Sequence, residues 1–556
     1  MQLRSSVPQA GSARRPTAGP PSRDTARRSS AAVRASAPRS GGPAGGAPRA
    51  PPPGAASAAA SAPAASIASL PLAPGPAPSP LPALEDETLA LAANPLQYAL
   101  DARARHGGGG PVFRVPVFMQ GNVYMVVTTD AITDILADDG NSVAFNNSEA
   151  FKRLMRDEVS NETMANGALR MQQRRMLSPA FSNDALNAYV PIMVEQVEQS
   201  LAGLVSSEGR SFDLRYEVRT MTVDLANNLL VGITGLDEAT KRRLQELMDD
   251  FFIGTQTQMI SLLPGSPFMK AMEARKELDE LLKPRLVEQR DAMMGRGRIG
   301  RGAKPRKSVL ATMMEARIAM GDEDALSDLD ALTNQCIGIL LAGIDTSGSG
   351  FTNTLLALTQ LPGVVEKLRE EQRRVVEAHG PAITRAALDA MPYLDAVVRE
   401  VQYISPSGAL NFRHTQRDID VQGRRVPKDS LLLLHWQAAH ALEDAEQRGR
   451  PGPAMFKNAK SPVLDKEYLE QVFYPERWMA GSGAPRPTML SFHHGPFTCL
   501  GMMLYFLEAK SVVATLLRNY DLQLLSEPAY IPWMHMPMSV PDKRWPVWAR
   551  LTANPL

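Results

Sequence analysis

Cysteine is scarce in this sequence: only Cys336 and Cys499 occur among 556 residues. Two distant cysteines cannot build the disulfide framework on which small secreted domains depend. The scarcity therefore favours a reducing compartment. The chain is long enough for one large domain or several smaller ones, so its core does not need cross-links.

Long apolar runs are also missing. Beyond the N-terminal region, no window reaches the roughly 18 uncharged apolar residues that a membrane-spanning helix requires. We therefore expect no transmembrane anchor, while peripheral membrane contact stays compatible with the sequence.

The sequence has no large excess of positive or negative charge, since 60 Lys and Arg balance 59 Asp and Glu. The part beyond residue 84 is mildly acidic, which argues against nucleic acid as a partner.

The first 84 residues have a different composition. They consist mainly of Ala, Pro, Ser, Gly and Arg, with nine Arg, no Lys and one acid, Asp24. Large apolar side chains are too sparse to bury a core, so we expect disorder. Arg-rich, acid-poor composition is typical of an organelle transit peptide. The Ala and Pro content favours a chloroplast over a mitochondrion, and a plain disordered tail is the other interpretation.

The sequence thus predicts a disordered transit peptide and linker over 1–84 and a folded domain over 85–556. Hydrophobic periodicity in the second part predicts a mainly α fold with small β-sheets. A helix is expected over 95–105, and a hairpin is expected from 112–117 and 123–128. Longer helices are expected over 185–204, 238–252, 267–294, 328–359, 364–379 and 502–519.

The most informative segment is Phe-His-His-Gly-Pro-Phe-Thr-Cys-Leu-Gly, from Phe492 to Gly501. It places Cys499 in a Gly/Pro loop immediately before a strongly helical run. A single thiolate at a helix N-terminus, with glycines that let the backbone approach closely, suits ligation of haem iron by one sulfur.

The spacing of Phe492, Gly495, Cys499 and Gly501 resembles the haem-binding loop of the cytochrome P-450 superfamily. The resemblance covers nearly all of 89–556 and is that of a divergent member, of a plant or algal plastid type. It implies haem b as the cofactor, Cys499 as the iron ligand, and haem between the long central helix and the helix after Cys499. The chain departs from the family at Phe497, where Arg or His is usual.

Ala-Gly-Ile-Asp345-Thr346, in the long central helix, is similar to the oxygen-activating helix of the same family. A hydroxyl beside a carboxylate can relay protons to bound dioxygen, so Asp345 and Thr346 are the predicted catalytic residues. Small residues such as Gly343 are expected to let the helix approach the flat cofactor. The alternative is a buried helix whose Asp and Thr only bond the backbone.

Three arginines are candidates for binding the haem propionates. Arg170 and Arg174 stand four positions apart, on one helix face. Arg174 is at the usual Arg position of the family, whereas Arg170 stands where Trp or His is usual. Arg413 matches a further donor on a strand. The alternative for each is a solvated surface arginine.

A second departure concerns the ionic cluster of the scaffold. The family's Glu-x-x-Arg pattern is matched by Glu400, but its Arg position is Tyr403. Arg477 matches the third member of the cluster. Removing one partner from a buried ionic network is destabilising, so we expect the Tyr403 hydroxyl to donate to Glu400.

The resemblance implies a monooxygenase that inserts one oxygen atom from dioxygen into an apolar small molecule. The segment Leu262–Leu278 resembles the branch acting on sterols, retinoids and terpenoids, which favours an isoprenoid substrate. An electron donor is then required, either ferredoxin or an NADPH-dependent reductase. The alternatives are a hydroperoxide isomerase or dehydratase, and a catalytically silent haem-binding protein.

Overall fold

The computed structural model describes residues 64–76, 85–120, 123–145, 148–156, 167–205, 210–257, 260–294, 307–321, 326–449 and 461–556. All of these ranges belong to one compact unit over 62–556. The proposed transit peptide falls mostly outside the described residues.

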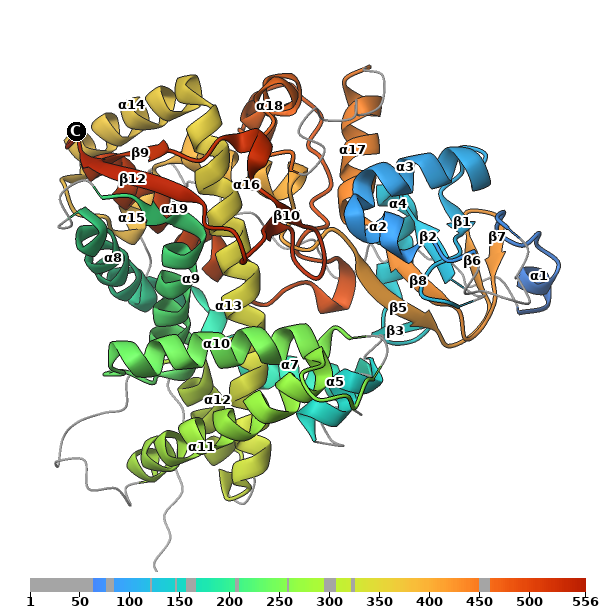
Figure 1. Cartoon of the computed structure of the whole chain (residues 1–556), viewed down its shortest axis with the longest axis horizontal. Helices are drawn as coiled ribbons and strands as arrows, with labels where there is room; N and C mark the ends of the chain where they lie inside the picture. The colour runs from blue at the N-terminus through green and yellow to red at the C-terminus, as the bar shows by residue number, and fades with distance from the viewer. Residues whose placement is uncertain are drawn as a thin grey trace, which may run out of the picture. The chain divides into compact units, whose positions relative to one another are not determined.

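The unit is dominated by helices, as the sequence predicts (Figure 1). The predicted long helices correspond to α8, α10, α11, α13, α14 and α19. The α-helices are α1 Ala64–Ala68, α2 Thr88–Ala93, α3 Pro95–His106, α4 Thr129–Ala137, α5 Glu149–Met155, α7 Gly167–Leu177, α8 Asn183–Val205, α9 Leu214–Leu225, α10 Glu238–Thr255, α11 Pro267–Met293, α12 Val309–Ala319, α13 Leu329–Gln360, α14 Pro362–His379, α15 Arg385–Asp389, α16 Pro392–Ile404, α17 Trp436–Gln447, α18 Lys466–Val472 and α19 Met502–Asn519.

The strands form small sheets, the largest of which has the order β1-β2-β8-β5-β3. Its predicted hairpin is confirmed, because β1 pairs with β2 in antiparallel register. The other sheets have the orders β4-β12-β9, β6-β7 and β10-β11. The strands are β1 Val112–Arg114, β2 Val123–Val126, β3 Val143–Phe145, β4 Phe212–Asp213, β5 Asn411–Thr415, β6 Ile419–Val421, β7 Arg424–Val426, β8 Leu431–Leu434, β9 Tyr520–Leu524, β10 Trp533–Met534, β11 Val540–Pro541 and β12 Trp548–Ala553.

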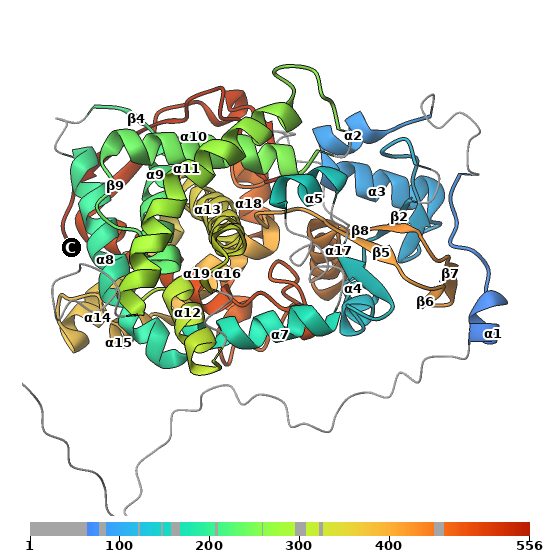
Figure 2. The same cartoon turned by 90° about the horizontal axis from the view of Figure 1, so that it is seen from below.

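The central element is α13, which Figure 2 shows nearly end-on with other helices around it. Its N-terminus is capped by Asp328, whose side chain accepts the backbone N–H groups of Asp330 and Ala331. Such a cap satisfies amides that have no partner within the helix. Beyond Ser347 the helix is almost entirely buried, because α9, α11, α16 and α19 pack against it.

The predicted disorder over 1–84 does not hold for residues 71–75. Leu72 forms a parallel bridge with Arg425 of β7. Ala73 donates its N–H to the Arg425 carbonyl oxygen at 3.1 Å, and the Pro74 carbonyl accepts the N–H of Arg114 at 2.7 Å. Ala73 is 1% exposed. Residues 71–75 are ordered because strands β1 and β7 offer them backbone hydrogen-bond partners. The composition of the segment gives no sign of these distant partners.

Candidate functional site

The loop that carries Cys499 has a backbone fixed by a glycine. Residues Gly495–Phe497 form a single 3₁₀ turn, and Gly495 has φ of +70°. A Cβ at Gly495 would lie closer than 3.0 Å to the carbonyl oxygen of Leu136 in α4. Both the left-handed conformation and the close approach require glycine. The N–H of Cys499 then donates to the Phe492 carbonyl oxygen at 2.8 Å, which closes the loop.

The two thiols have different surroundings. Cys336 is fully buried in α13, and burial raises its pKa to about 12. Cys499 is exposed at the start of α19. The protein around it raises its pKa through desolvation, while the N–H groups of Gly501 and Met502 and the charge of Arg174 act in the opposite direction. Cys499 is therefore the accessible thiol, and donors that favour its thiolate stand beside it.

Arg170 and Arg174 of α7 both reach this loop, and their predicted role in binding the haem propionates stays a prediction. Arg174 donates to the Thr498 carbonyl oxygen at 2.6 Å. The guanidinium of Arg170 lies 3.8 Å from the ring centroid of Phe497 and 5.5 Å from that of Phe145. Burial lowers the pKa of Arg170 to about 10, and neither arginine pairs with a carboxylate among the described residues.

Arg413 is also close, but its charge is already compensated. Its guanidinium is completely buried and binds both carboxylate oxygens of Asp139, at 2.9 to 3.2 Å. It also donates to Asn411 and to the Phe412 carbonyl oxygen. It also contacts His493 Nδ1 at 3.4 Å and lies 4.8 Å from the ring centroid of Phe145. A propionate role for Arg413 stays a prediction.

The predicted acid and alcohol of α13 point in different directions. The Thr346 side chain is exposed midway along the helix, and its hydroxyl donates to the Ala342 carbonyl oxygen at 2.6 Å. Asp345 is buried and forms an ion pair with Arg219 of α9 at 2.6 Å. Burial raises the pKa of Asp345, and the Arg219 charge opposes that shift. Arg219 also pairs with Asp249 of α10.

Sequence reasoning missed Arg219 and the neighbour of Gly343. A Cβ at Gly343 would collide with the side chain of Leu230. The glycine therefore admits a close neighbour from the π-helical segment η3, Ala226–Val231, and the expected approach to a cofactor stays a prediction. No local pattern marks Arg219, because its partner lies 126 positions away along the chain.

Glu508 of α19 is a second residue that sequence reasoning missed. Its carboxyl group is buried, and desolvation raises its pKa to about 8, with a hydrogen bond from Ser347 acting in the opposite direction. Ser347 lies directly after Thr346 on α13. A lone acid within the apolar run 502–517 was the signal that could have revealed it.

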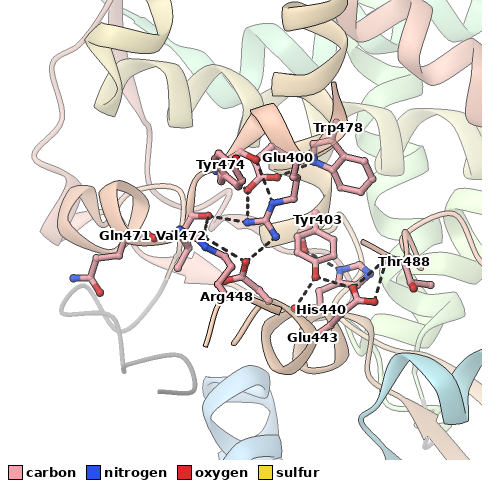
Figure 3. Close-up of polar contacts among 12 residues, drawn as sticks. Glu400, Tyr403, His440, Glu443, Arg448, Gln471, Val472, Tyr474, Trp478 and Thr488 are labelled. Carbon is pink, nitrogen blue, oxygen red and sulfur yellow. Dashed lines mark hydrogen bonds and ion pairs between the residues drawn. The ribbon is translucent and has the colours of Figure 1, made fainter. Parts of the chain in front are cut away.

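The scaffold cluster differs from the prediction (Figure 3). Glu400 is fully buried and pairs with Arg477 at 3.3 Å. It accepts the N–H of Tyr474 at 2.9 Å and the indole N–H of Trp478 at 2.8 Å. The expected hydrogen bond from Tyr403 to Glu400 is wrong, because these three donors already satisfy Glu400.

The Tyr403 hydroxyl has a different partner. It lies 2.8 Å from a carboxylate oxygen of Glu443 in α17. Glu443 is 40 positions away along the chain and belongs to no pattern around Tyr403. Arg477 keeps its charge balanced through Asp444, the neighbour of Glu443, at 2.7 Å.

These residues fit haem. Haem presents an iron that binds a thiolate and two propionates that bind cations. One loop brings together the exposed Cys499 thiol and the guanidinium groups of Arg170 and Arg174, neither of which forms an ion pair with a carboxylate of the described residues. The fit also explains how two half-buried arginines remain without an acidic partner among the described residues.

The comparisons with known proteins agree with this geometry. The sequence matches the profile of cytochrome P450 across residues 87–445. The chain belongs to the cytochrome P450 family. It is therefore a haem-containing monooxygenase with an apolar substrate and a redox partner. The profile match ends before Cys499, so the loop itself is assigned by its geometry.

Two plant relatives illustrate the distance within this family. Beta-amyrin 11-oxidase of Glycyrrhiza uralensis is 26% identical over 68% of this chain and 70% of its own length. Abscisic acid 8'-hydroxylase 1 of Arabidopsis thaliana is 25% identical over 67% of this chain and 70% of its own length. The retinoic acid-bound cyanobacterial CYP120A1 has the same fold, with a TM-score of 0.68 and 22% identity over 87% of this chain and 100% of its own.

The first prediction concerns Gly495. Gly495→Ala combines a strained positive φ with a collision at Leu136, so it should displace the Cys499 loop. We expect haem retention after gel filtration to fall at least about 10-fold, from a cost of several kcal/mol. The matched control is Gly481→Ala, which has φ of +78° but open space around its Cβ. Equal losses in the two variants would show that backbone strain alone matters.

The second prediction concerns the stacked pair. Arg170→Phe removes a desolvated cation worth roughly 2 kcal/mol, so haem affinity should fall about 30-fold in a titration of the haem-free protein. The exchange variant Arg170→Phe/Phe497→Arg returns a cation to the same place and should recover most of that affinity. Arg175→Phe, at an exposed position of the same helix, should have no effect. A double variant as weak as the single one would contradict the pairing.

Proposed function

We propose that this cytochrome P450 inserts one oxygen atom from dioxygen into an apolar isoprenoid, with Cys499 as the iron ligand. The observation that carries the assignment of Cys499 is its exposed thiol at the start of α19, beside two guanidinium groups without carboxylate partners. The isoprenoid class is supported by relatives named for β-amyrin, abscisic acid and ent-kaurenoic acid, which are terpenoids.

Haem bound through a thiolate supplies the oxygen chemistry, because the sulfur pushes electron density to favour O–O cleavage. The residues of the chain handle protons and orientation. Thr346 holds its hydroxyl in one direction through its bond to Ala342. Asp345 lies beside a small pocket lined by Arg215, Arg219 and Lys543 among others, and it directly precedes Thr346 on α13.

The third prediction tests this proton path. Asp345→Asn and Thr346→Ala should each lower product formed per NADPH consumed by at least about 10-fold, since positioned acids contribute 10²–10⁴-fold. Hydrogen peroxide should replace the missing product. Thr333→Ala, which removes a hydroxyl that donates to the Leu329 carbonyl oxygen near the start of α13, is the control and should keep the yield. Unchanged coupling in both variants would remove Asp345 and Thr346 from the mechanism.

The same assay separates the alternatives. Product that requires dioxygen and an electron donor supports a monooxygenase. Turnover of a lipid hydroperoxide without either would instead indicate an isomerase or dehydratase. Ferredoxin with its reductase and an NADPH-dependent reductase are compared as donors, and we expect ferredoxin to give the faster reduction if the protein is plastidic.

We also propose a plastid location, on the composition of residues 1–63. Within the described residues no helix is both long enough and apolar enough to cross a membrane. Because Ala73 is buried and residues 71–75 pair with β1 and β7, processing must leave this segment in place.

The fourth prediction concerns that processing. N-terminal sequencing of the protein isolated from its native cells should find a start at or before Leu70. A fusion of residues 1–63 to a fluorescent protein should enter chloroplasts, and the same fusion with the nine arginines changed to glutamine should stay outside them. A start beyond Gly75, or import into mitochondria, would contradict the proposal.

A further inference from the structure

The segment that leads into the Cys499 loop is held by α16 and α17. The N–H of Thr488 donates to the carboxylate of Glu443, at 3.1 and 3.2 Å. The N–H of Leu490 donates to His440 Nε2 at 3.0 Å. The hydroxyl of Ser491 donates to a carbonyl oxygen near the end of α16 at 2.6 Å. Three of the four residues over 488–491 are thus tied to these helices.

Tyr403 belongs to α16, and its side chain reaches His440 and Glu443 of α17 (Figure 3). Its hydroxyl has two acceptors, a carboxylate oxygen of Glu443 at 2.8 Å and the carbonyl oxygen of His440 at 2.9 Å. Its ring stacks on the His440 ring, with centroids 4.4 Å apart. One side chain therefore fixes both groups that receive the amides of Thr488 and Leu490. The three residues Tyr403, His440 and Glu443 are called the Tyr403 clamp below.

The orientation of His440 is determined by its hydrogen bonds. Nδ1 lies 2.8 Å from the Tyr403 carbonyl oxygen, which can only accept, so Nδ1 carries the hydrogen. Nε2 is then unprotonated and accepts the N–H of Leu490. Burial lowers the pKa of His440 to about 3, in agreement with a neutral ring. Neither nitrogen can leave its partner without stranding a buried polar group.

The clamp is connected to the sulfur through a short path. Leu490 accepts the N–H of His493 on its carbonyl oxygen at 2.8 Å, and Phe492 accepts the N–H of Cys499 at 2.8 Å. The backbone between the clamp and the loop therefore has few free torsions. A shift at Leu490 moves the acceptor that holds Cys499.

We propose that the Tyr403 clamp positions Cys499, and that Tyr403 acts there as a positioning residue through hydrogen bonds without a charge. The inference rests on the proposed role of Cys499 as the iron ligand. Arg477 already lies between Glu400 and Asp444, at 3.3 and 2.7 Å. An uncharged donor at position 403 therefore completes the network without a second buried cation.

The fifth prediction tests the positioning role of Tyr403 by removing its hydroxyl group. Tyr403→Phe is made in the full chain, which is loaded with haem. The matched control is Tyr189→Phe, whose ring is 1% exposed and whose hydroxyl lies beside Thr312 in a different part of the helical body. We expect Tyr403→Phe to raise at least threefold the fraction of the reduced, carbon monoxide-bound spectrum that shows a thiol rather than a thiolate ligand. Tyr189→Phe should leave that fraction unchanged.

A second readout does not depend on haem. Amide hydrogen exchange at Thr488 and Leu490 should become about 10-fold faster in Tyr403→Phe and stay unchanged in Tyr189→Phe. If Tyr403→Phe loses thermal stability but keeps both the thiolate band and the protection of these amides, the positioning role is overturned.

A second pair of variants covers the case in which Tyr403→Phe does not fold. Glu443→Gln keeps a side-chain oxygen that accepts hydrogen bonds and should retain the thiolate band, whereas Glu443→Ala should lose most of it. Equal behaviour of these two would also overturn the proposal. A wild-type protein without a thiolate band would refute the role of Cys499 instead, and the exchange rates would still decide whether the clamp orders residues 488–490.

Discussion

The proposed haem site depends on one constraint, which is the fixed position of the Cys499 sulfur. Cys499 sits on a loop that has little regular structure, so its place is set by contacts from elsewhere. Gly495 packs against α4, Arg174 of α7 holds the carbonyl of Thr498, and α16 and α17 hold residues 488–491. Elements from distant parts of the chain thus converge on residues 488–501. A loop constrained from several sides is rigid in a way that its own sequence cannot provide.

The predicted catalytic residues on α13 are held in a different way from the Cys499 loop. The long helix α13 is rigid because it is largely buried, and beyond its first turn only Ala342 and Thr346 are exposed. Asp345, in the same turn, is turned away and neutralised by Arg219. An ionised carboxylate in such a place without a cation would be strongly unfavourable. The Arg219 guanidinium offsets the burial of the Asp345 carboxylate, while the Ala342 carbonyl oxygen fixes the exposed hydroxyl of Thr346.

Local signals in the sequence were sufficient for some parts of this site and not for others. Apolar periodicity predicted α13 and α19, and the Gly/Pro loop predicted the place of Cys499, because each signal is contained in neighbouring residues. The partners of Tyr403 and Asp345 were not predicted, since 40 and 126 positions separate the pairs. The packing of Leu230 against Gly343 was not predicted for the same reason: helix propensity shows that a glycine is unusual, but not which side chain lies against it.

The two departures from the family pattern share one physical logic. At Phe497 the loop lacks the Arg or His that is usual in the family. Arg170 of α7 lies over the Phe497 ring, so a positive charge is still present there, supplied by a different element. At Tyr403 the scaffold loses a cation, and the hydroxyl donates to Glu443 in its place. Burying an additional ion carries a desolvation penalty of several kcal/mol, whereas a neutral buried hydrogen bond contributes about 1 kcal/mol net. Replacing a buried arginine by the neutral hydrogen bond of Tyr403 therefore costs little stability, provided that Arg477 alone can balance the charges of Glu400 and Asp444. Its contacts to both carboxylates meet that condition, which explains how a P450 fold tolerates the loss of an arginine from its central ionic cluster.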